Sequence, residues 1–432
     1  MRFLLYRVGR FCRDPLSLIP WLLFLAAALL LVVKGAANAA IFFLSILCTF
    51  SLIRDRARLS ELSKKRTLYA VLSLSAMLFF EVVSQLGRQE IRAPAFDGPI
   101  RLLLLIPVYS YMVQSDCSSH IRALALGSGV GILLVAASLL VFPEYYWGYR
   151  AATYFVDPIT LPCFTTILLG IFLMVDPLAD RKNLKITSQC LVLIATGFVV
   201  LDSASRTSWV AFLGLMIFWL AFNYLRRPKI FVLGLVAFTV LVASLYYVSP
   251  MVRLRVDDVF QVLSAFASGR TEALAPMIQN SAIGHRLILL MIDLRLIYEF
   301  PWFGAHDNLP LTFLGLKESI PLLTEQIYEI KTLSGSHSEF LAQLVGKGVI
   351  GGLLTIWALF GYPVLRVLQQ HLKRETGTFF AGVGMYGVVI PALLSSLTIQ
   401  ILNLKMTVSF YGLCLVLFLA YADYREKHHD HL

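Results

Sequence analysis

The amino-acid sequence predicts an all-α, polytopic membrane protein with about twelve transmembrane helices. Of its 432 residues, 58% are hydrophobic and only 15% are charged, and the mean hydropathy is +0.76. Soluble domains carry about 25% charged residues, so a water-soluble core is excluded. The apolar runs reach the length of about 20 residues that a helix needs to cross a bilayer. The alternating pattern of a membrane β-barrel is absent, which leaves helices.

These apolar runs divide the chain into three parts. We expect an N-terminal transmembrane bundle of about nine helices over residues 1–248, a large loop over residues 249–337, and about three further helices with a cytoplasmic tail over residues 338–432. The predicted spans are 16–33, 38–53, 67–85, 99–114, 122–142, 153–176, 186–202, 207–225, 230–248, 338–365, 378–398 and 404–423. The other connections are short, so we expect function to reside at the long one.

Basic residues set the expected orientation. The net charge is +11, but the basic side chains lie in short connections beside apolar spans, so we predict no nucleic-acid partner. With the N-terminus in the cytoplasm, the inner connections are the basic ones, as is usual for membrane proteins. They contain Arg54, Arg56, Arg58, Lys64, Lys65, Arg66, Arg181, Lys182, Lys185, Arg226, Arg227, Lys229, Arg366, Lys373 and Arg374. Both termini are therefore expected in the cytoplasm, and the long loop on the outer side.

Within this outer loop, residues 284–300 have an apolar, helical pattern. Charged residues such as Arg286 and Asp293 interrupt the run, so we predict an interfacial helix that lies along the membrane rather than across it. Pro301 would end this helix, and Gly304 would allow a turn after it.

Three residues on the outer side have side chains suited to anion chemistry. Arg206 lies between two spans with almost no loop, Arg286 opens the interfacial helix, and His337 precedes the tenth span. The free N–H groups at a helix start also favour anions. Each residue has an ordinary interpretation as well: a headgroup contact for Arg206, an ion pair for Arg286 and a helix cap for His337. Their common side of the membrane favours one shared site.

This set of side chains suits the transfer of a sugar from a lipid diphosphate. Guanidinium groups bind phosphate oxygens bidentately and stay protonated, so they can neutralise the leaving group in place of a metal. A neutral imidazole can accept the proton of the attacking hydroxyl. The sequence contains no Gly-rich phosphate loop, HExxH motif or carboxylate-rich cluster, so we expect no cofactor and no metal.

Four short motifs surround these residues. They are Ser205-Arg206-Thr207, Gly284-x-Arg286-Leu287, Pro301-x-x-Gly304, and His337-Ser338-x-x-Leu341-x-x-Leu344-x-x-x-Gly348-x-x-Gly351. In this order and spacing they resemble the O-antigen ligase and polymerase superfamily. Two positions depart from the family pattern, because His306 stands where a glycine is common and Ser338 where asparagine is frequent.

The resemblance implies a metal-independent glycosyltransferase of lipopolysaccharide biosynthesis in the bacterial inner membrane. It would transfer O-antigen from undecaprenyl diphosphate to a sugar hydroxyl of lipid A–core at a periplasmic site, with these lipid-linked glycans and membrane lipids as partners. His337 would be the base, and Arg206 and Arg286 would bind the diphosphate. Arg150, after Trp147-Gly148-Tyr149 on another outer loop, is a further candidate for phosphate contact, although such clusters are mostly interfacial anchors.

Three other functions are alternatives. An O-antigen polymerase would be expected to carry two large arginine-rich outer loops, and a protein O-oligosaccharyltransferase a larger C-terminal domain. The sequence has one large outer loop and a short tail after the last predicted span, which favours the ligase. A non-enzymatic lipid-glycan flippase or other transporter would need ionisable residues or broken helices near the midplane, and the predicted spans carry few charges.

Overall fold

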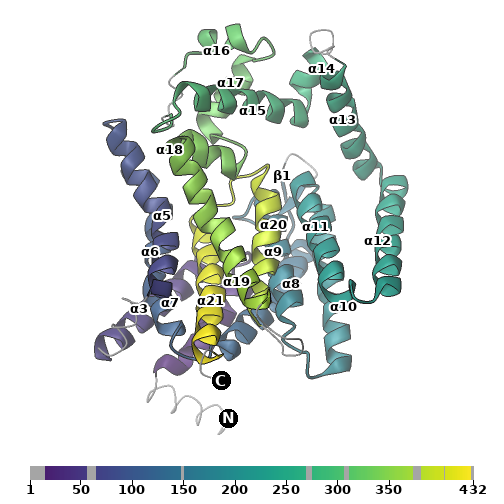
Figure 1. The fold of residues 1–432 in the computed structure, drawn as a ribbon. Coiled ribbons are helices and arrows are strands. Elements are labelled where there is room, and N and C mark those ends of the chain that lie inside the picture. The colour runs from purple at the N-terminus through teal and green to yellow at the C-terminus, as the bar shows by residue number, and fades with distance from the viewer. Residues whose placement is uncertain are drawn as a thin grey trace.

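The computed structural model describes residues 15–55, 65–146, 150–268, 275–305, 311–372, 381–402 and 404–429. Within these ranges the regular elements are helices, apart from one antiparallel strand pair, β1 (Glu144–Tyr146) and β2 (Arg150–Ala152). The predicted all-α class is therefore confirmed. The apolar helices form one bundle, and a second group of helices covers one end of it (Figure 1).

The helices of the bundle come from both ends of the sequence, and the covering helices come from the segment between them. The bundle consists of α2 (Ile19–Ala28), α3 (Ala36–Arg54), α5 (Lys65–Gly87), α6 (Asp97–Leu103), α7 (Ile106–Met112), α8 (Ser118–Val141), α9 (Thr160–Val175), α10 (Lys182–Asp202), α11 (Arg206–Tyr224), α12 (Pro228–Val248), α18 (Glu339–Ile356), α19 (Tyr362–Leu372), α20 (Gly384–Ser396) and α21 (Lys405–His429). The covering helices are α13 (Pro250–Ala267), α14 (Ala275–Asn280), α15 (Ala282–Glu299), α16 (Phe313–Ser319) and α17 (Glu325–Ser334). Three short 3-10 helices, η1 (Pro15–Leu18), η3 (Ala93–Phe96) and η5 (Ala381–Val383), and the π-helix η4 (Trp357–Gly361) complete the described elements.

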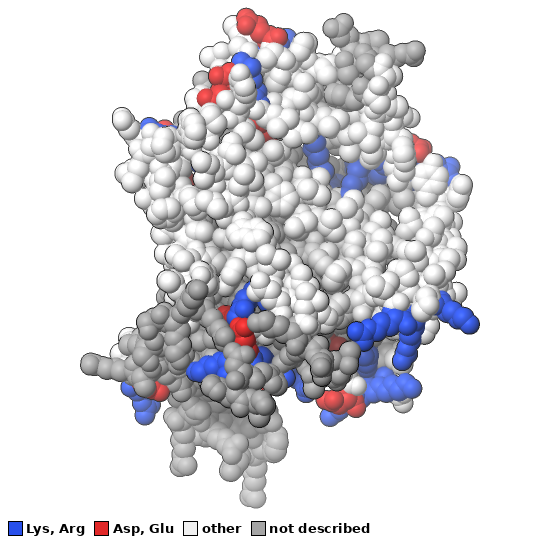
Figure 2. Space-filling model, viewed as in Figure 1, with Lys and Arg blue, Asp and Glu red and all other residues white. Residues whose placement is uncertain are grey.

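The helices of the bundle have the composition of membrane spans. Eight of the described helices are long and apolar enough to cross a bilayer, and three shorter apolar helices accompany them, Leu16–Ala28, Thr160–Val175 and Gly384–Ser396. On the face drawn in Figure 2, an uncharged band crosses the bundle, and Lys and Arg gather at the end where α10 begins and α11 meets α12. The protein is therefore a membrane protein, while the number of twelve crossings stays a prediction.

Two predicted spans differ from the observed helices. The span 99–114 is not one helix but two of seven residues each, α6 and α7, which at about 10 Å are too short to cross a bilayer singly. Pro107 has no N–H to donate to a preceding carbonyl, so the helix ends and restarts there. The span 153–176 becomes helical only at α9. Its start is capped by the Asp157 carboxylate, which accepts the N–H groups of Ile159 and Thr160 at 2.8 and 2.9 Å.

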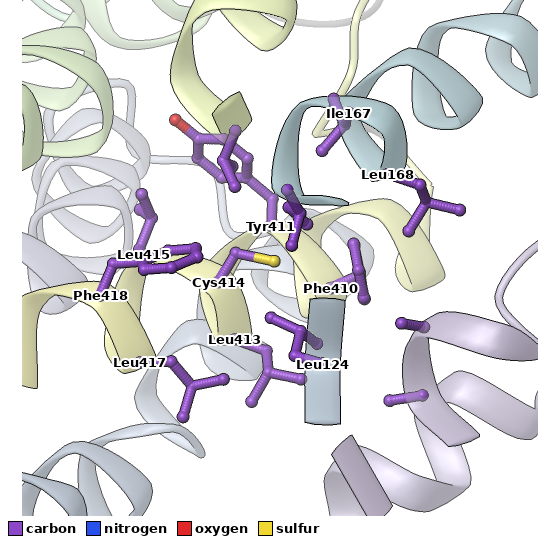
Figure 3. Packing of buried hydrophobic residues seen from close by; sticks show 14 of the residues in the cluster. Leu124, Ile167, Leu168, Phe410, Tyr411, Leu413, Cys414, Leu415, Leu417 and Phe418 are labelled. Atoms are coloured by element: carbon purple, nitrogen blue, oxygen red, sulfur yellow. The ribbon is translucent and has the colours of Figure 1, made fainter. Parts of the chain in front are cut away.

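Helix α21 forms the centre of the bundle. Its most apolar stretch of 18 residues is 100% buried within the protein. Figure 3 shows Phe410, Leu413 and Leu417 of this helix in one buried cluster with Leu124 of α8 and Ile167 of α9. Helix α12 is the opposite case, because it contains no buried residue and its apolar side chains are left for lipid.

Small residues allow the bundle helices to approach closely. A Cβ on Gly170 of α9 would lie 1.9 Å from the backbone oxygen of Gly387 in α20, and one on Gly387 would lie 2.2 Å from the oxygen of Gly170. Backbone-to-backbone packing of this kind is typical of membrane helices, which lack a hydrophobic driving force between them. This contact fixes α9 against α20, and it also fixes the position of the segment directly before α9.

The helices α13 to α17 form a helical cap with a hydrophobic core of its own. Ile288, Ile292 and Leu296 of α15 are buried with Leu316 and Ile327 from α16 and α17. The region predicted as one large loop with an interfacial helix holds five described helices. The predicted helix itself is present as α15, which runs across the end of the bundle, crosswise to α18 and α11 (Figure 1).

The cap is fastened to α18 at a kink in that helix. Gly348 has a φ of 72° inside α18, and Gly304 has a φ of 75° in the turn after α15, a conformation that glycine adopts without strain. The N–H of Val349 donates to the Pro301 oxygen at 2.8 Å. A Cβ on Gly348 would lie 2.2 Å from the oxygen of Trp302. Two of the sequence motifs are thus the two halves of one backbone contact.

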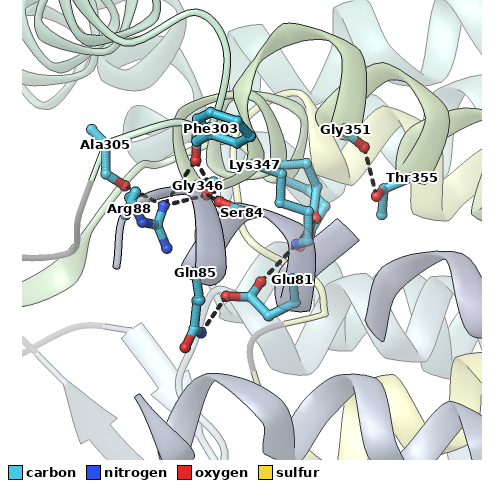
Figure 4. A network of polar contacts seen from close by, with 12 residues as sticks. Glu81, Ser84, Gln85, Arg88, Phe303, Ala305, Gly346, Lys347, Gly351 and Thr355 are labelled. Atoms are coloured by element: carbon cyan, nitrogen blue, oxygen red, sulfur yellow. Dashed lines mark hydrogen bonds and ion pairs between the residues drawn. The ribbon is translucent and has the colours of Figure 1, made fainter. Parts of the chain in front are cut away.

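Side chains at the end of α5 and directly after it hold the same turn from the other side. Arg88 Nη1 donates to the carbonyl oxygens of Phe303, Ala305 and Gly346 at 3.1, 3.0 and 2.6 Å. Ser84 Oγ donates to the Gly346 oxygen at 2.8 Å, as Figure 4 shows. Charged donors on carbonyl groups contribute more than neutral ones. These bonds fix the position of α15 relative to the bundle.

Candidate active site

Three of the four predicted site residues line one cavity of about 610 Å³, which we call the arginine cavity. It lies between the starts of α9 and α15, the turn from α17 to α18, and the segment that follows α20. Its lining residues are Arg150, Asp157, Ile159, Thr160, Arg255, Ala282, His285, Arg286, Leu289, Ile330, Ser336, His337, Thr398, Ile399, Gln400 and Leu404. Figure 2 shows Lys and Arg atoms in a hollow beneath the cap, in keeping with a cationic cavity.

Arg286 projects from the second turn of α15. This helix begins at Ala282, two residues before the predicted start, because the hydroxyl of Ser281 accepts the N–H of Gly284 at 2.8 Å and caps it. Gly284 also allows close packing, since a Cβ there would lie 1.8 Å from the oxygen of Ile278. Burial, and after it the charge of Arg206, lowers the pKa of the Arg286 guanidinium. The group still keeps its proton, so the site stores uncompensated positive charge that suits an anion.

Thr207 links this arginine to the opposite wall of the cavity. Arg286 Nη1 donates to Thr207 Oγ1 at 3.5 Å, and Thr207 Oγ1 shares a hydrogen bond of 2.5 Å with Thr398 Oγ1. The start of α11, the start of α15 and the segment after α20 therefore meet at one point. Segments that are far apart in the sequence are brought together here.

Arg206 lies beside the arginine cavity rather than in its wall. Its Nη2 pairs with Asp258 of α13 at 2.5 Å, and it lines an adjoining cavity of about 740 Å³, the side cavity, with Arg253 and Arg255. Arg255 lines both cavities. The sequence analysis expected Arg206 in one pocket with Arg286 and His337. The structure places it in the adjoining cavity, held by an ion pair with a carboxylate that the sequence did not indicate.

His337 lies in the turn directly before α18. It does not cap that helix, because Ser338 does so: its hydroxyl accepts the N–H of Leu341 at 3.5 Å and donates to the Ser396 oxygen at 2.9 Å. Burial, followed by the nearby charges of Arg286 and Lys331, lowers the pKa of His337 to about 4. The imidazole is therefore neutral at pH 7 and can accept a proton.

A buried ionic network holds the turn that carries His337. Lys331 of α17 pairs with Asp293 of α15, and the two side chains are only 3% and 1% exposed. The hydroxyl of Ser336 donates to Asp293 and accepts from Lys331, both at 2.9 Å. Burial raises the pKa of Asp293, and the neighbouring Lys331 opposes that shift. In the sequence, Asp293 was interpreted only as an interruption of an apolar run.

Arg150 reaches the arginine cavity from strand β2. Its Nε donates to the carbonyl oxygen of Ser203 at 2.9 Å, which ties the strand pair to the turn before α11. The preceding residues 147–149 and His306 lie outside the described residues. Among the residues that the structure describes, no group of three or more His, Cys, Asp or Glu is arranged to hold a metal ion.

We compared the chain with known protein families. The family model described as O-antigen ligase matches residues 191–356. This segment is a domain of the O-antigen ligase superfamily. The matched segment of this superfamily contains Arg206, Arg286 and His337, whereas Arg150 lies outside it. No curated protein matches the chain.

The sequence analysis missed two arginines of α13 that line these cavities. Arg255 lines both the arginine cavity and the side cavity, and its neighbour Arg253 lines the side cavity. The pair of arginines directly after the ninth predicted span could have indicated them. Gln400 also lines the arginine cavity, and no sequence pattern indicated it. Its Nε2 donates to the oxygen of Ser336, a residue far away in the sequence, so only the tertiary structure brings it to the site.

Proposed function

We propose that this protein is an O-antigen ligase of lipopolysaccharide biosynthesis. It transfers a glycan from undecaprenyl diphosphate to a sugar hydroxyl of lipid A–core, at a periplasmic site in the bacterial inner membrane. The observation that carries the proposal is one cavity that brings Arg286 and Arg255 together with a neutral His337. The superfamily match supports the same reaction class.

In this proposal, the arginines bind the diphosphate of the donor. Arg286 and Arg255 approach from two helices of the cap, and Arg150 approaches from strand β2. A guanidinium group binds two phosphate oxygens at once. It neutralises the charge that grows on the diphosphate as the sugar leaves, so we expect transfer without a divalent metal.

His337 is the proposed general base. The acceptor hydroxyl attacks the anomeric carbon, the bond from that carbon to the diphosphate oxygen breaks, and its electron pair stays on the diphosphate. The hydroxyl proton passes to the imidazole nitrogen. The pKa of about 4 in the unliganded protein makes a weak base, but a bound diphosphate raises that pKa by its negative charge. The donor therefore strengthens the base that acts on it.

In this proposal, Arg206 joins the diphosphate site by exchanging its ion pair with Asp258 for one with the bound diphosphate. It now pairs with Asp258, and a diphosphate in the arginine cavity offers it a competing anion with two charges. The side cavity that contains Arg206, Arg253 and Arg255 adjoins the arginine cavity through Arg255 and Ala282. We infer that it receives part of the donor headgroup.

Purified protein tests the proposal directly. We would incubate it in detergent with undecaprenyl diphosphate-linked glycan, rough lipopolysaccharide and a chelator. We expect glycan-extended lipopolysaccharide to form. Absence of that product, with and without added Mg²⁺, would refute the ligase assignment. Lengthening of the lipid-linked glycan without rough lipopolysaccharide would identify an O-antigen polymerase, and a glycosylated protein acceptor would identify an oligosaccharyltransferase.

Two variants test the proposed roles. His337→Ala should abolish transfer and leave donor binding nearly unchanged, because only the base is lost. Arg286→Lys should lower kcat/KM despite its retained charge, since lysine cannot form the bidentate fork. His371→Ala, at the far end of α19, is the matched control and should transfer normally. Near-normal turnover by His337→Ala would remove the base assignment.

A transporter remains the alternative from another class. An ion pair joins α5 to α18: Lys347 Nζ lies 3.2 Å from the Glu81 carboxylate (Figure 4). Such a fixed pair braces two helices and offers no free ionisable group for coupling. Liposomes that contain the protein and donor alone separate the two classes, since a transporter would move the lipid and leave its glycan attached.

A further inference from the structure

A third cavity lies on the far side of the turn that carries His337. It has a volume of about 620 Å³ and lies between α5, α6, α18 and α21. Its polar lining comes from Asp97, Glu339, Gln343, Gln400 and Lys405, and its apolar lining includes two prolines at the start of α6. We call it the proline cavity.

The turn before α18 and the turn between α20 and α21 form the wall between the arginine cavity and the proline cavity. The N–H of Glu339 donates to the Ile399 oxygen at 3.1 Å, and the N–H of Leu402 donates to Glu339 Oε2 at 2.9 Å. On one side of this wall is His337, and on the other is Glu339. Gln400 lines both cavities. The proposed base is thus two residues along the chain from the lining of the proline cavity.

The two cavities differ in charge. Three arginines and two histidines line the arginine cavity, with Asp157 as its one carboxylate. The proline cavity contains no arginine among its lining residues, and its one lysine, Lys405, pairs with Asp97 at 3.0 Å. A diphosphate would therefore prefer the arginine cavity. The proline cavity offers hydrogen-bond donors and acceptors without a net positive field.

This combination suits a neutral polyhydroxyl ligand. Carboxylate and amide oxygens accept hydrogen bonds from sugar hydroxyls, and the Lys405 ammonium donates to them. The apolar side chains of Met77, Pro94 and Pro99 can cover the C–H faces of a sugar ring. The side chain of Glu339 is already oriented, since Gln343 Nε2 donates to it at 2.6 Å. Oriented polar groups of this kind give specificity at a lower entropic cost.

We propose that the proline cavity binds sugar residues of the acceptor glycan, so that acceptor and donor reach His337 from opposite sides of one wall. This inference rests on the proposed glycosyl transfer, which requires two substrates to meet at one base. In it, Gln400 lies at the crossing point, where the acceptor hydroxyl passes toward the anomeric carbon of the donor.

Separate Michaelis constants for donor and acceptor test this inference. Lys405→Ala removes an exposed donor, and Ala342→Trp fills the cavity from its α18 wall. We expect Lys405→Ala to raise the KM for rough lipopolysaccharide about tenfold, the effect of losing one charged hydrogen bond. Ala342→Trp should raise the same KM at least as much because the indole occupies the space of the sugar, and neither variant should change the KM for the donor more than twofold. Lys317→Ala, an exposed lysine of α16, is the matched control.

Binding without turnover separates this inference from the proposed function. The probe is soluble core oligosaccharide released from rough lipopolysaccharide, titrated against the full-length protein in detergent. Weaker binding to both variants than to the wild type and Lys317→Ala would support the acceptor site, even if the wild type transferred nothing. Equal binding to all four proteins, or an equal rise in both Michaelis constants, would overturn it.

Discussion

Lowering the pH from 7 to 5 should leave kcat/KM for glycan transfer nearly unchanged. Burial, with the charges of Arg286 and Lys331 next in size, lowers the pKa of His337 to about 4. The proposed base therefore stays deprotonated through the range in which an ordinary histidine, with a pKa of about 6.5, gains a proton. The pKa shifts downward because burial and the nearby positive charges disfavour the cationic form of the imidazole ring.

The expected magnitude follows from the fraction of neutral imidazole. With a pKa of about 4, about 90% of His337 is neutral at pH 5. With the ordinary pKa, about 3% would be neutral at pH 5 and about three quarters at pH 7, so the rate would fall about 25-fold. The two cases differ by more than the error of an initial-rate assay.

The assay is the initial rate of glycan transfer at low donor concentration, in detergent, between pH 4 and pH 8. Because kcat/KM reports the free enzyme, its acid limb should lie near pH 4, whereas the limb of kcat should lie at higher pH because the bound diphosphate raises the pKa of the base. A thermal unfolding scan at each pH checks that the fold survives. A midpoint of kcat/KM near pH 6.5 would refute the reasoning, because His337 would then feel neither the burial nor the neighbouring charges.

Two further predictions concern the contacts that hold the site. Gly348→Ala should lower the melting temperature, because its Cβ would lie 2.2 Å from a backbone oxygen at a φ of 72°. The control is Gly346→Ala, whose Cβ would meet nothing within 4 Å. Equal melting temperatures for the two variants would contradict this explanation. Lys331→Met should destabilise the protein by about 3–5 kcal/mol, because it leaves Asp293 buried without a partner, and Asp293→Asn in the same protein should restore part of the loss, as measured by thermal unfolding. If Lys331→Met alone melts like the wild type, the network is not what holds the turn.

Much of the bundle could be predicted because hydropathy is a local property. The spans predicted over 38–53, 186–202, 207–225 and 230–248 agree within a few residues with the described helices α3, α10, α11 and α12. In each case about 20 consecutive apolar residues leave the backbone no hydrogen-bond partner in lipid except its own helix. Pro107 could have indicated the break between α6 and α7, but the length of the apolar run led us to predict one span there.

The candidate site could be predicted only in its residue types. Arginine and histidine were chosen because a diphosphate leaving group and an attacking hydroxyl require them, and the order of the motifs placed them in one superfamily. The partners could not be predicted. Asp258 pairs with Arg206, and Lys331 pairs with Asp293 across 38 residues, because no local pattern states which distant charge a side chain will meet.

The sequence by itself determined that this protein is a helical membrane protein with a domain of the O-antigen ligase superfamily, because composition and short motifs are carried by neighbouring residues. Only the tertiary structure decided that Arg286 and His337 line one cavity while Arg206 lies beside it. It also decided that the imidazole is neutral well below pH 6.5. The physical reason is that burial and Coulomb interactions depend on distances in space, and those distances are set by how α15 is fastened across the end of the bundle.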